Sequence, residues 1–299
     1  PYVILTTSSA TYCHSDFLFA KDTFPLYLPG DCLFDCPPFH PPVRYGHRAM
    51  PSPFVHLHCH SMFSLYDAMG DVDQLVERAK ELGYDALALT DHSALYGVIE
   101  FYEAAKKAGI KPIIGVEAAV APHKHTDKRS GIDNRVSHIT LLAETNEGYQ
   151  NLLKLVSASY LEGFYYVPRI DQDLMRRYAK GMIALSGCMK GEIPKACQSH
   201  DRERAEELIR RYQDIFGGNN FFLELVHHPE SPTQTEINDI LIELSQKTGA
   251  PLVATKDVNY LHADDREAQD VLVCIHDGKL LSDQSRHSMT FTDHSMSSP

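Results

Sequence analysis

The stretch Phe54-Val-His-Leu-His-Cys-His-Ser61 combines a short apolar run with three alternating histidines. We expect a strand over residues 54–58, because this run is short and ends in polar residues. Side chains two positions apart on a strand point to the same face, so His58 and His60 are suited to bind one metal ion. Imidazole is the commonest metal ligand in proteins. A chance pair is the alternative reading, since the chain holds 17 histidines.

Beyond this stretch, the hydrophobic pattern alternates between strands and helices. Glycines follow two of the predicted helices, where a C-terminal cap belongs. The alternation predicts an α/β fold, either a parallel α/β barrel or a doubly wound sheet. The predicted strands are 54–58, 86–90, 113–118, 139–143, 182–186, 221–226 and 252–255, and the predicted helices are 72–82, 98–105, 150–161, 202–216 and 236–246.

Composition limits the possible partners and compartment. The formal charge of −12 does not attract nucleic acid, so any DNA contact would be local or mediated by metal ions. The seven cysteines show no paired spacing, which favours a reducing cytoplasm over a disulfide framework. No apolar run has the length of a membrane span, and no membrane partner is expected.

The first 49 residues differ from the rest of the chain. They contain seven of the 17 prolines and no helical or strand period. We therefore expect residues 1–49 to be a disordered or extraneous extension, with Met50 as a plausible true start. The domain itself is expected over 50–283, followed by a truncated tail over 284–299.

Polar residues gather where the predicted strands end. In parallel α/β barrels, the carboxyl ends of the strands carry the chemistry. Each residue alone has an ordinary explanation, such as a helix cap for Asp91 or a small buried hydrophobe for Cys188. Together, histidine, carboxylate and thiol groups indicate zinc, manganese or iron. His138 fits less well, because it opens its predicted strand. The other strand-end residues are His58, His60, Asp91, His92, Glu117, Cys188, His227, His228, Asp257 and Asn259.

Several motifs, taken together, resemble the PHP (polymerase and histidinol phosphatase) family. Examples are Ala88-Leu-Thr-Asp-His92 and Val253-Ala-Thr-Lys-Asp257, and the similarity extends over about residues 50–283. It is closest to the amino-terminal PHP domain of bacterial replicative DNA polymerase III alpha subunits. Residues 148–152 and 160–164 favour this branch over free-standing phosphatases. The resemblance implies a distorted seven-stranded (β/α) barrel of the PHP type.

The resemblance also implies a set of metal ligands for two or three divalent ions. Asn259 stands where the family usually has histidine, and Lys256 stands where it usually has asparagine, so Asn259 is a weak ligand. His58, His60, Glu117 and Asp257 are the expected catalytic residues, and Asp91 and His228 are expected to support the ligands. The implied ligands are His58, His60, Asp67, His92, Glu117, His138, Cys188, Asp257 and Asn259.

For function, the resemblance implies DNA replication, with metal-dependent phosphodiester hydrolysis (3′→5′ exonuclease proofreading) in the domain itself. No polymerase palm follows Asp257, so the chain is expected to be an amino-terminal fragment of a DNA-directed DNA polymerase. Expected partners are primer–template DNA, a proofreading exonuclease subunit and a sliding clamp. The alternatives are a free-standing metallophosphoesterase of the histidinol phosphatase kind and a non-catalytic scaffold domain.

Overall fold

The computed structural model describes residues 54–283, 285, 286, 288 and 290–298. The predicted extension 1–49 lies outside the described residues, and the predicted tail 284–299 is described in part. Within the described residues, no helix is long and apolar enough to cross a membrane.

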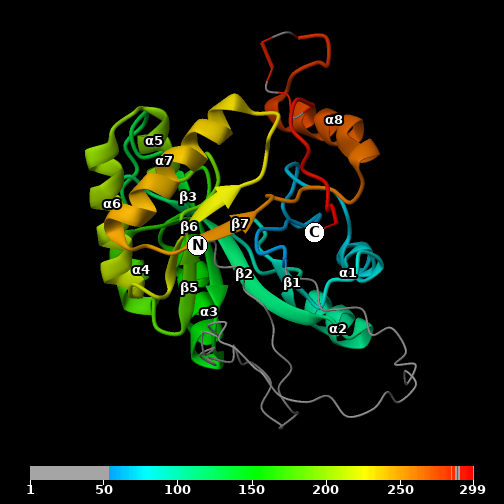
Figure 1. Cartoon of the computed structure of the whole chain (residues 1–299), viewed down its shortest axis with the longest axis horizontal. Coiled ribbons are helices and arrows are strands. Elements are labelled where there is room, and N and C mark those ends of the chain that lie inside the picture. Colours follow the sequence, from blue (N-terminus) through cyan, green and yellow to red (C-terminus); the bar gives the residue numbers. More distant parts are fainter. Residues whose placement is uncertain (1–53, 284, 287, 289, 299) are drawn as a thin grey trace, which may run out of the picture.

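One mixed sheet forms the centre of the fold (Figure 1). Its buried, apolar strands agree with the predicted ones within a few residues, except that the short fourth strand was not predicted. The strands are β1 (Ala86–Leu89), β2 (Lys111–Val120), β3 (Ser137–Ala143), β4 (Arg169–Ile170), β5 (Met182–Leu185), β6 (Phe221–Val226) and β7 (Leu252–Thr255). They are ordered β1-β2-β3-β5-β6-β7, and β4 pairs with β2.

The stretch 54–60 closes the curled sheet between its two edge strands. The predicted strand 54–58 is wrong as a regular strand, because only an isolated bridge joins Cys59 to Val258. Instead, the Ala88 amide donates to the His56 carbonyl oxygen on the β1 side, at 2.9 Å. On the β7 side, the Val258 amide donates to the His58 carbonyl oxygen at 3.0 Å. The result is the expected distorted, seven-stranded α/β barrel.

The expected all-parallel strand arrangement is wrong at β3. This strand runs antiparallel to both β2 and β5. The chain returns from β2 to β3 through residues 121–136 without a crossover helix, and a parallel pair would require such a crossover. Because β3 is reversed, His138 at its start lies opposite Ala119 near the carboxyl end of β2. The direction of β3 therefore brings His138 to the same end of the barrel as the other polar residues.

A buried arginine holds the connection between β2 and β3. The Arg169 side chain is fully buried and donates to four backbone carbonyl oxygens. Three of them belong to this connection, at His125, Asp127 and Asp133, each at 2.7 Å. A guanidinium can satisfy several acceptors in fixed directions, so Arg169 fixes the path by which the chain enters β3.

The helices lie outside the sheet, with α4 to α7 on one flank and α1, α2 and α8 on the other (Figure 1). The five predicted helices are present, and α4, α5 and α8 were not predicted. Two of these three have only seven residues, too few to show a helical period. The helices are α1 (Val72–Glu81), α2 (Val98–Ala108), α3 (Asn146–Leu161), α4 (Gln172–Tyr178), α5 (Glu192–Gln198), α6 (Arg202–Phe216), α7 (Pro232–Thr248) and α8 (Arg266–Asp277).

Residues 290–298 pack along the chain that leaves β7. The Asn259 amide donates to the His294 carbonyl oxygen at 2.9 Å, and the Met296 amide donates to the Tyr260 carbonyl oxygen at 3.0 Å. Met296 is buried in the main hydrophobic core. The last described residues are thus part of the packed domain and lie beside the end of β7.

Candidate metal centre

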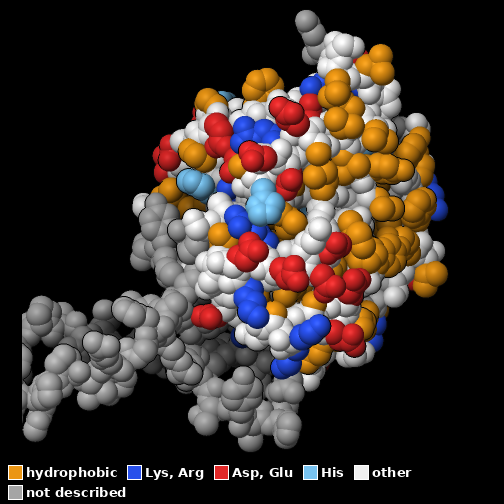
Figure 2. Space-filling model, turned by 90° about the vertical axis from the view of Figure 1, so that its right-hand side faces the viewer, with side chains coloured by type: hydrophobic (Ala, Val, Ile, Leu, Met, Phe, Trp, Pro, Cys, Tyr) orange, Lys and Arg blue, Asp and Glu red, His pale blue; other side chains and the backbone are white. Residues whose placement is uncertain are grey.

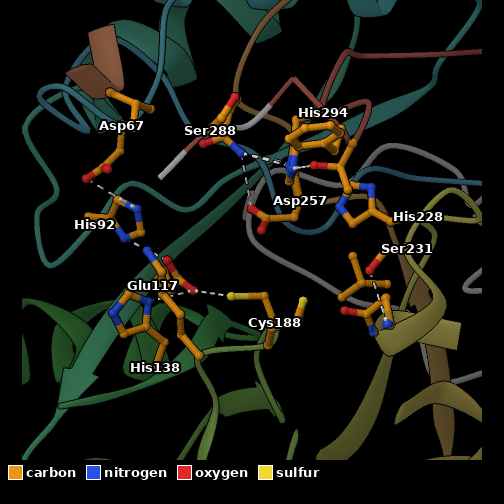
Figure 3. Close-up of a pocket in the computed structure, with 18 of the residues that line it drawn as sticks. Asp67, His92, Glu117, His138, Cys188, His228, Ser231, Asp257, Ser288 and His294 are labelled. Atoms are coloured by element: carbon orange, nitrogen blue, oxygen red, sulfur yellow. Dashed lines mark hydrogen bonds and ion pairs between the residues drawn. The ribbon is translucent and has the colours of Figure 1, made fainter. Parts of the chain in front are cut away.

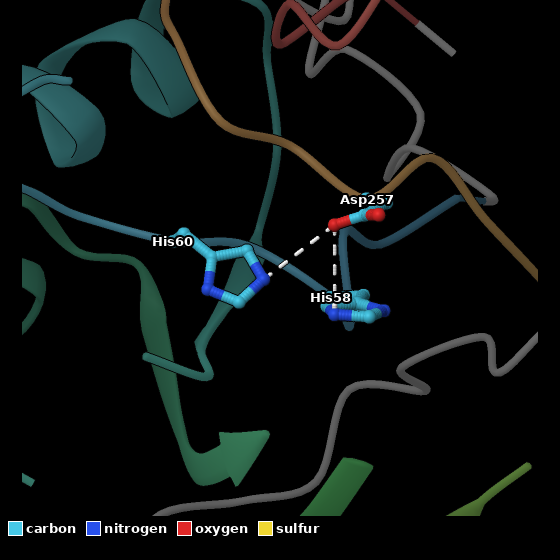
Figure 4. A group of neighbouring side chains, drawn as sticks. All are labelled: His58, His60 and Asp257. Carbon is cyan, nitrogen blue, oxygen red and sulfur yellow. Dashed lines mark ion pairs between the residues drawn. The ribbon is translucent and has the colours of Figure 1, made fainter. Parts of the chain in front are cut away.

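Two histidines from the closing stretch face an aspartate that follows β7 (Figure 4). The Asp257 Oδ1 atom lies 3.6 Å from His58 Nε2 and 3.5 Å from His60 Nε2. His58 and His60 are buried, and the Asp257 side chain is 16% exposed. These three residues form one group whose ligand atoms lie within 4.8 Å of one another.

Glu117 on β2 lies within 3.5 Å of His58 Nε2 and 3.7 Å of His60 Nε2, and it also faces His92, His138 and Cys188 (Figure 3). One of its carboxylate oxygens, Oε2, lies 2.6 Å from His92 Nδ1, and the other, Oε1, lies 3.1 Å from His138 Nδ1. The Cys188 thiol donates to Oε1 at a distance of 3.5 Å. Two further ligand groups result, His60–His92–Glu117 and Glu117–His138–Cys188. A buried carboxylate that is shared between groups is suited to bridge two cations.

Asp67 lies at the edge of the centre. Its Oδ2 atom is 3.8 Å from His92 Nε2, and its Oδ1 atom is 3.3 Å from Nδ1 of His276 on α8. Asp67 belongs to none of the three compact ligand groups. His276 was not among the predicted site residues, although the stretch Ile275-His-Asp-Gly278 is one of those that resemble the family.

Asn259 also lies outside the compact groups. Its side-chain amide donates to the backbone carbonyl oxygen of Asp257 at 3.0 Å and faces His294 Nδ1 at 3.4 Å. The Lys256 ammonium is paired with Asp293 at 2.9 Å. The two departures from the family pattern thus meet residues of the segment 290–298.

Asp91 fixes the loop that carries the ligands and takes part in none of the ligand groups. Its carboxylate accepts hydrogen bonds from the Ser61 amide, the Ser61 hydroxyl and the Ser64 hydroxyl, at 2.7 to 2.8 Å. The Ser64 hydroxyl in turn accepts from the His92 amide at 3.0 Å. Asp91 therefore fixes the loop that follows His60 against the backbone of His92.

Sequence reasoning missed Glu224 on β6. Its Oε1 atom lies 2.7 Å from His58 Nδ1 and accepts from the Thr255 hydroxyl at the same distance. A carboxylate that accepts from one ring nitrogen of a ligand histidine fixes the ring and leaves the other nitrogen for a metal. A carboxylate within the otherwise apolar predicted strand 221–226 was the sequence signal that could have identified Glu224.

Electrostatic coupling dominates the centre. Burial alone lowers the pKa of His58 and His92. The carboxylates of Glu224 and Asp257 raise the pKa of His58 by more, so that it lies well above 6.5. The carboxylate of Glu117 does the same for His92, whose pKa is also above 6.5. Burial raises the pKa of Glu117 and Asp257, yet neighbouring histidines hold both well below their usual values. For His60, burial and the charge of His92 lower the pKa. The buried histidines and carboxylates of the centre thus stabilise one another's charged forms, except at His60.

The residues present fit divalent metal ions. His58 Nε2 and His138 Nδ1 are buried and make no hydrogen bond to any described residue, although both lie within ion-pair distance of Glu117. Nitrogen, oxygen and sulfur donors together suit zinc-like ions. His58, His60 and Asp257 would hold one ion, and Glu117, His138 and Cys188 would hold a second.

A cavity of about 620 Å³ extends from these ligands (Figure 3). His228 lines its other side, next to Ser231, and is only 6% exposed. The ring of His228 packs on that of His294 with 4.2 Å between centroids, and burial lowers the pKa of His228 to about 4. The cavity leaves room for a ligand between the metal centre and His228.

The curled α/β barrel of this chain carries clustered nitrogen, oxygen and sulfur ligands at one end, an arrangement typical of metal-binding α/β barrels. The chain belongs to the PHP domain family, because residues 56–228 match that family. The DNA polymerase III alpha subunit of Borreliella burgdorferi is 44% identical over 239 residues, 80% of this chain and 21% of that protein. The corresponding subunit of Thermus aquaticus is 42% identical over 237 residues, 78% of this chain and 19% of that protein.

The chain therefore spans about a fifth of the length of these curated relatives. Among solved structures, an amidohydrolase from Chromobacterium violaceum aligns with 69% of this chain and 87% of its own, at a TM-score of 0.46 and 16% identity. A structural similarity this low assigns no function, so the family assignment is based on the sequence matches.

Proposed function

We propose that this chain is the amino-terminal PHP domain of a bacterial replicative DNA polymerase III alpha subunit and acts in DNA replication in the cytoplasm. The sequence identity to alpha subunits over about four-fifths of the chain supports this proposal. Primer–template DNA, a proofreading exonuclease subunit and a sliding clamp are the proposed partners of the whole polymerase.

The domain itself is proposed to hydrolyse phosphodiesters from the 3′ end of DNA, with two or three zinc, manganese or iron ions as cofactors. The observation that carries this proposal is the position of Glu117, whose carboxylate is shared by two ligand groups. When bound, adjacent divalent ions polarise a phosphoryl oxygen and lower the pKa of a bound water molecule. Magnesium alone is disfavoured, because it prefers oxygen ligands.

The protein's own residues would orient the ligand side chains and limit the access of water to one side of the site. Glu224 fixes the ring of His58, so that Nε2 of His58 faces Glu117 and Asp257. The burial of His58, His60 and Glu117 leaves the solvent-facing side of the site to the partly exposed ligands Asp67, His92, His138, Cys188 and Asp257. A phosphate ester would therefore approach from the cavity, where these groups are accessible.

The surface charge favours a local contact with DNA. Figure 2 shows acidic and basic side chains interleaved over one face of the molecule, with hydrophobic side chains gathered along one side of it. A net charge of −12 adds long-range repulsion to a polyanion. DNA binding would thus depend on the metal centre and on the rest of the polymerase.

A nuclease assay on the full chain tests this function. We expect the manganese- or zinc-loaded chain to degrade a mismatched primer from its 3′ end, and Asp257→Ala to reduce the rate at least about a hundredfold. A folded, metal-loaded chain without activity would instead support the scaffold function. Release of phosphate from small phosphomonoesters, without primer degradation, would support the histidinol phosphatase alternative.

A further inference from the structure

Lys190 lies at the mouth of the metal centre, in the loop between β5 and α5. It lines the same cavity as Glu117, Cys188 and Asp257, and its side chain is exposed. Its ammonium group makes no hydrogen bond or ion pair with any residue that the structure describes. A positive charge beside several ligands is thus left without a protein partner.

The loop that carries Lys190 is held in one conformation. Gly187 has φ = +82°, and a Cβ atom there would meet the His138 carbonyl oxygen at 2.7 Å. The His138 amide donates to the Lys190 carbonyl oxygen at 3.0 Å, and the Gly191 amide donates to the Cys188 carbonyl oxygen at 2.8 Å. These contacts fix the backbone of Cys188 and Lys190 together, so a thiol ligand and an ammonium group reach the cavity from one rigid turn.

The two other lysines near the centre are engaged elsewhere. The Lys195 ammonium donates to the Val136 carbonyl oxygen at 2.8 Å and to the Ser137 hydroxyl at 3.1 Å. The Lys256 ammonium is paired with Asp293 at 2.9 Å. Among the described lysines at this end of the barrel, Lys190 is therefore the one available to an incoming anion.

Lys190 brings a positive charge to this end of the barrel, because its side chain is exposed and an exposed lysine is protonated at neutral pH. An ammonium that faces acidic ligands attracts a phosphate ester to a site that would otherwise repel it. Three rotatable donors on a flexible stem suit the non-bridging oxygens of such an ester.

We propose that Lys190 is a substrate-binding residue whose ammonium donates to a non-bridging phosphoryl oxygen of a phosphate ester seated on the metal centre. The inference rests on the proposed function, because it assigns a phosphate ester as the ligand of that centre. Charge-assisted hydrogen bonds of this kind are among the stronger ones, so loss of the ammonium has a measurable effect on binding.

Calorimetric titration of the manganese-loaded full chain tests this role, with deoxyadenosine 5′-monophosphate and glycerol 2-phosphate as probes. We expect Lys190→Met to weaken both about tenfold or more, and Lys190→Arg to stay within about threefold of the parent. Bound metal, measured by mass spectrometry, should be unchanged in both variants. The probe that binds more tightly to the parent distinguishes a nucleotide from a small phosphomonoester as the natural source of the phosphate.

Lys180→Met is the matched control, because Lys180 is 79% exposed and is paired with Glu147, which does not line the cavity. Unchanged binding in Lys190→Met, or weaker binding that follows a loss of metal, would overturn the proposal. A chain without nuclease activity in which Lys190→Met still weakens phosphate-ester binding would reject the proposed nuclease and retain this role for Lys190.

Discussion

Glu224 illustrates how much a single buried carboxylate decides at this site. It contacts Nδ1 of His58, the ring nitrogen that does not face Glu117 and Asp257, and is itself held by the Thr255 hydroxyl. We expect Glu224→Gln to reduce metal affinity by about 10- to 100-fold, the usual effect of losing such a partner. Titration of the metal-free chain with zinc measures this, with the exposed Glu236→Gln on α7 as control. Equal zinc affinity in the parent and in Glu224→Gln would contradict the role assigned to Glu224.

Asn259 is a second residue with a separable effect. An amide oxygen is a weaker ligand for zinc-like ions than imidazole, and here the amide nitrogen is bonded to the Asp257 backbone. We expect Asn259→His to add about one bound ion per chain, at the position that Asp67 and His92 approach. Metal content determined by mass spectrometry checks this expectation. Asn259→Gln is the control, because it keeps an amide and should leave the number of bound metal ions unchanged. The same number of bound ions in Asn259→His as in the parent would contradict the expectation.

The junction of α3 with β5 depends on a glycine contact. A Cβ atom on Gly148, in the first turn of α3, would overlap the carbonyl oxygen of Gly181, which precedes β5. Alanine favours helices over glycine by up to about 1 kcal/mol, but a clash with backbone costs about 1–3 kcal/mol or more. We expect Gly148→Ala to lower the free energy of unfolding by about 2 kcal/mol in urea denaturation.

Gly218→Ala provides the matched comparison, because a Cβ atom there would meet nothing within 4 Å. Its free energy of unfolding should change by no more than about 0.5 kcal/mol. If Gly148→Ala were as stable as Gly218→Ala, the close approach of α3 to the loop before β5 would be wrong.

For the whole molecule, metal ions and protons compete for the same buried groups. In the metal-free protein, the raised pKa values of His58 and His92 give stability that is fully present below pH 6.5 and is lost as the pH rises through the raised values. The lowered pKa values of Glu117 and Asp257 give stability that is present above their ordinary values of 4.5 and 3.8 and is lost as the pH falls through the lowered values.

Metal binding requires deprotonated ligands, so its contribution to stability grows with pH. We expect the difference in melting temperature between the metal-loaded and the EDTA-treated chain to increase from pH 6 to pH 8. Scanning calorimetry in matched buffers measures it. A difference that stays constant or shrinks over this range would show that His58 and His92 do not hold protons in the metal-free state.

The amino-acid sequence alone determined the type of most elements and the chemistry of the candidate ligands. Short apolar runs predicted six of the seven strands, because burial on both faces requires apolar residues throughout. Histidine, carboxylate and thiol groups next to those runs predicted a zinc-like centre, because their donor chemistry is independent of the path of the chain.

Only the tertiary structure decided the direction of β3 and the path of residues 54–60. Both depend on pairing between residues far apart in the chain, which local patterns do not encode. The reversal of β3 brings His138 to Glu117, and the closing stretch brings His58 and His60 to Asp257. The support from Glu224 and the unpaired charge of Lys190 follow from the same long-range contacts, since a side chain's partners are known only once the chain is folded.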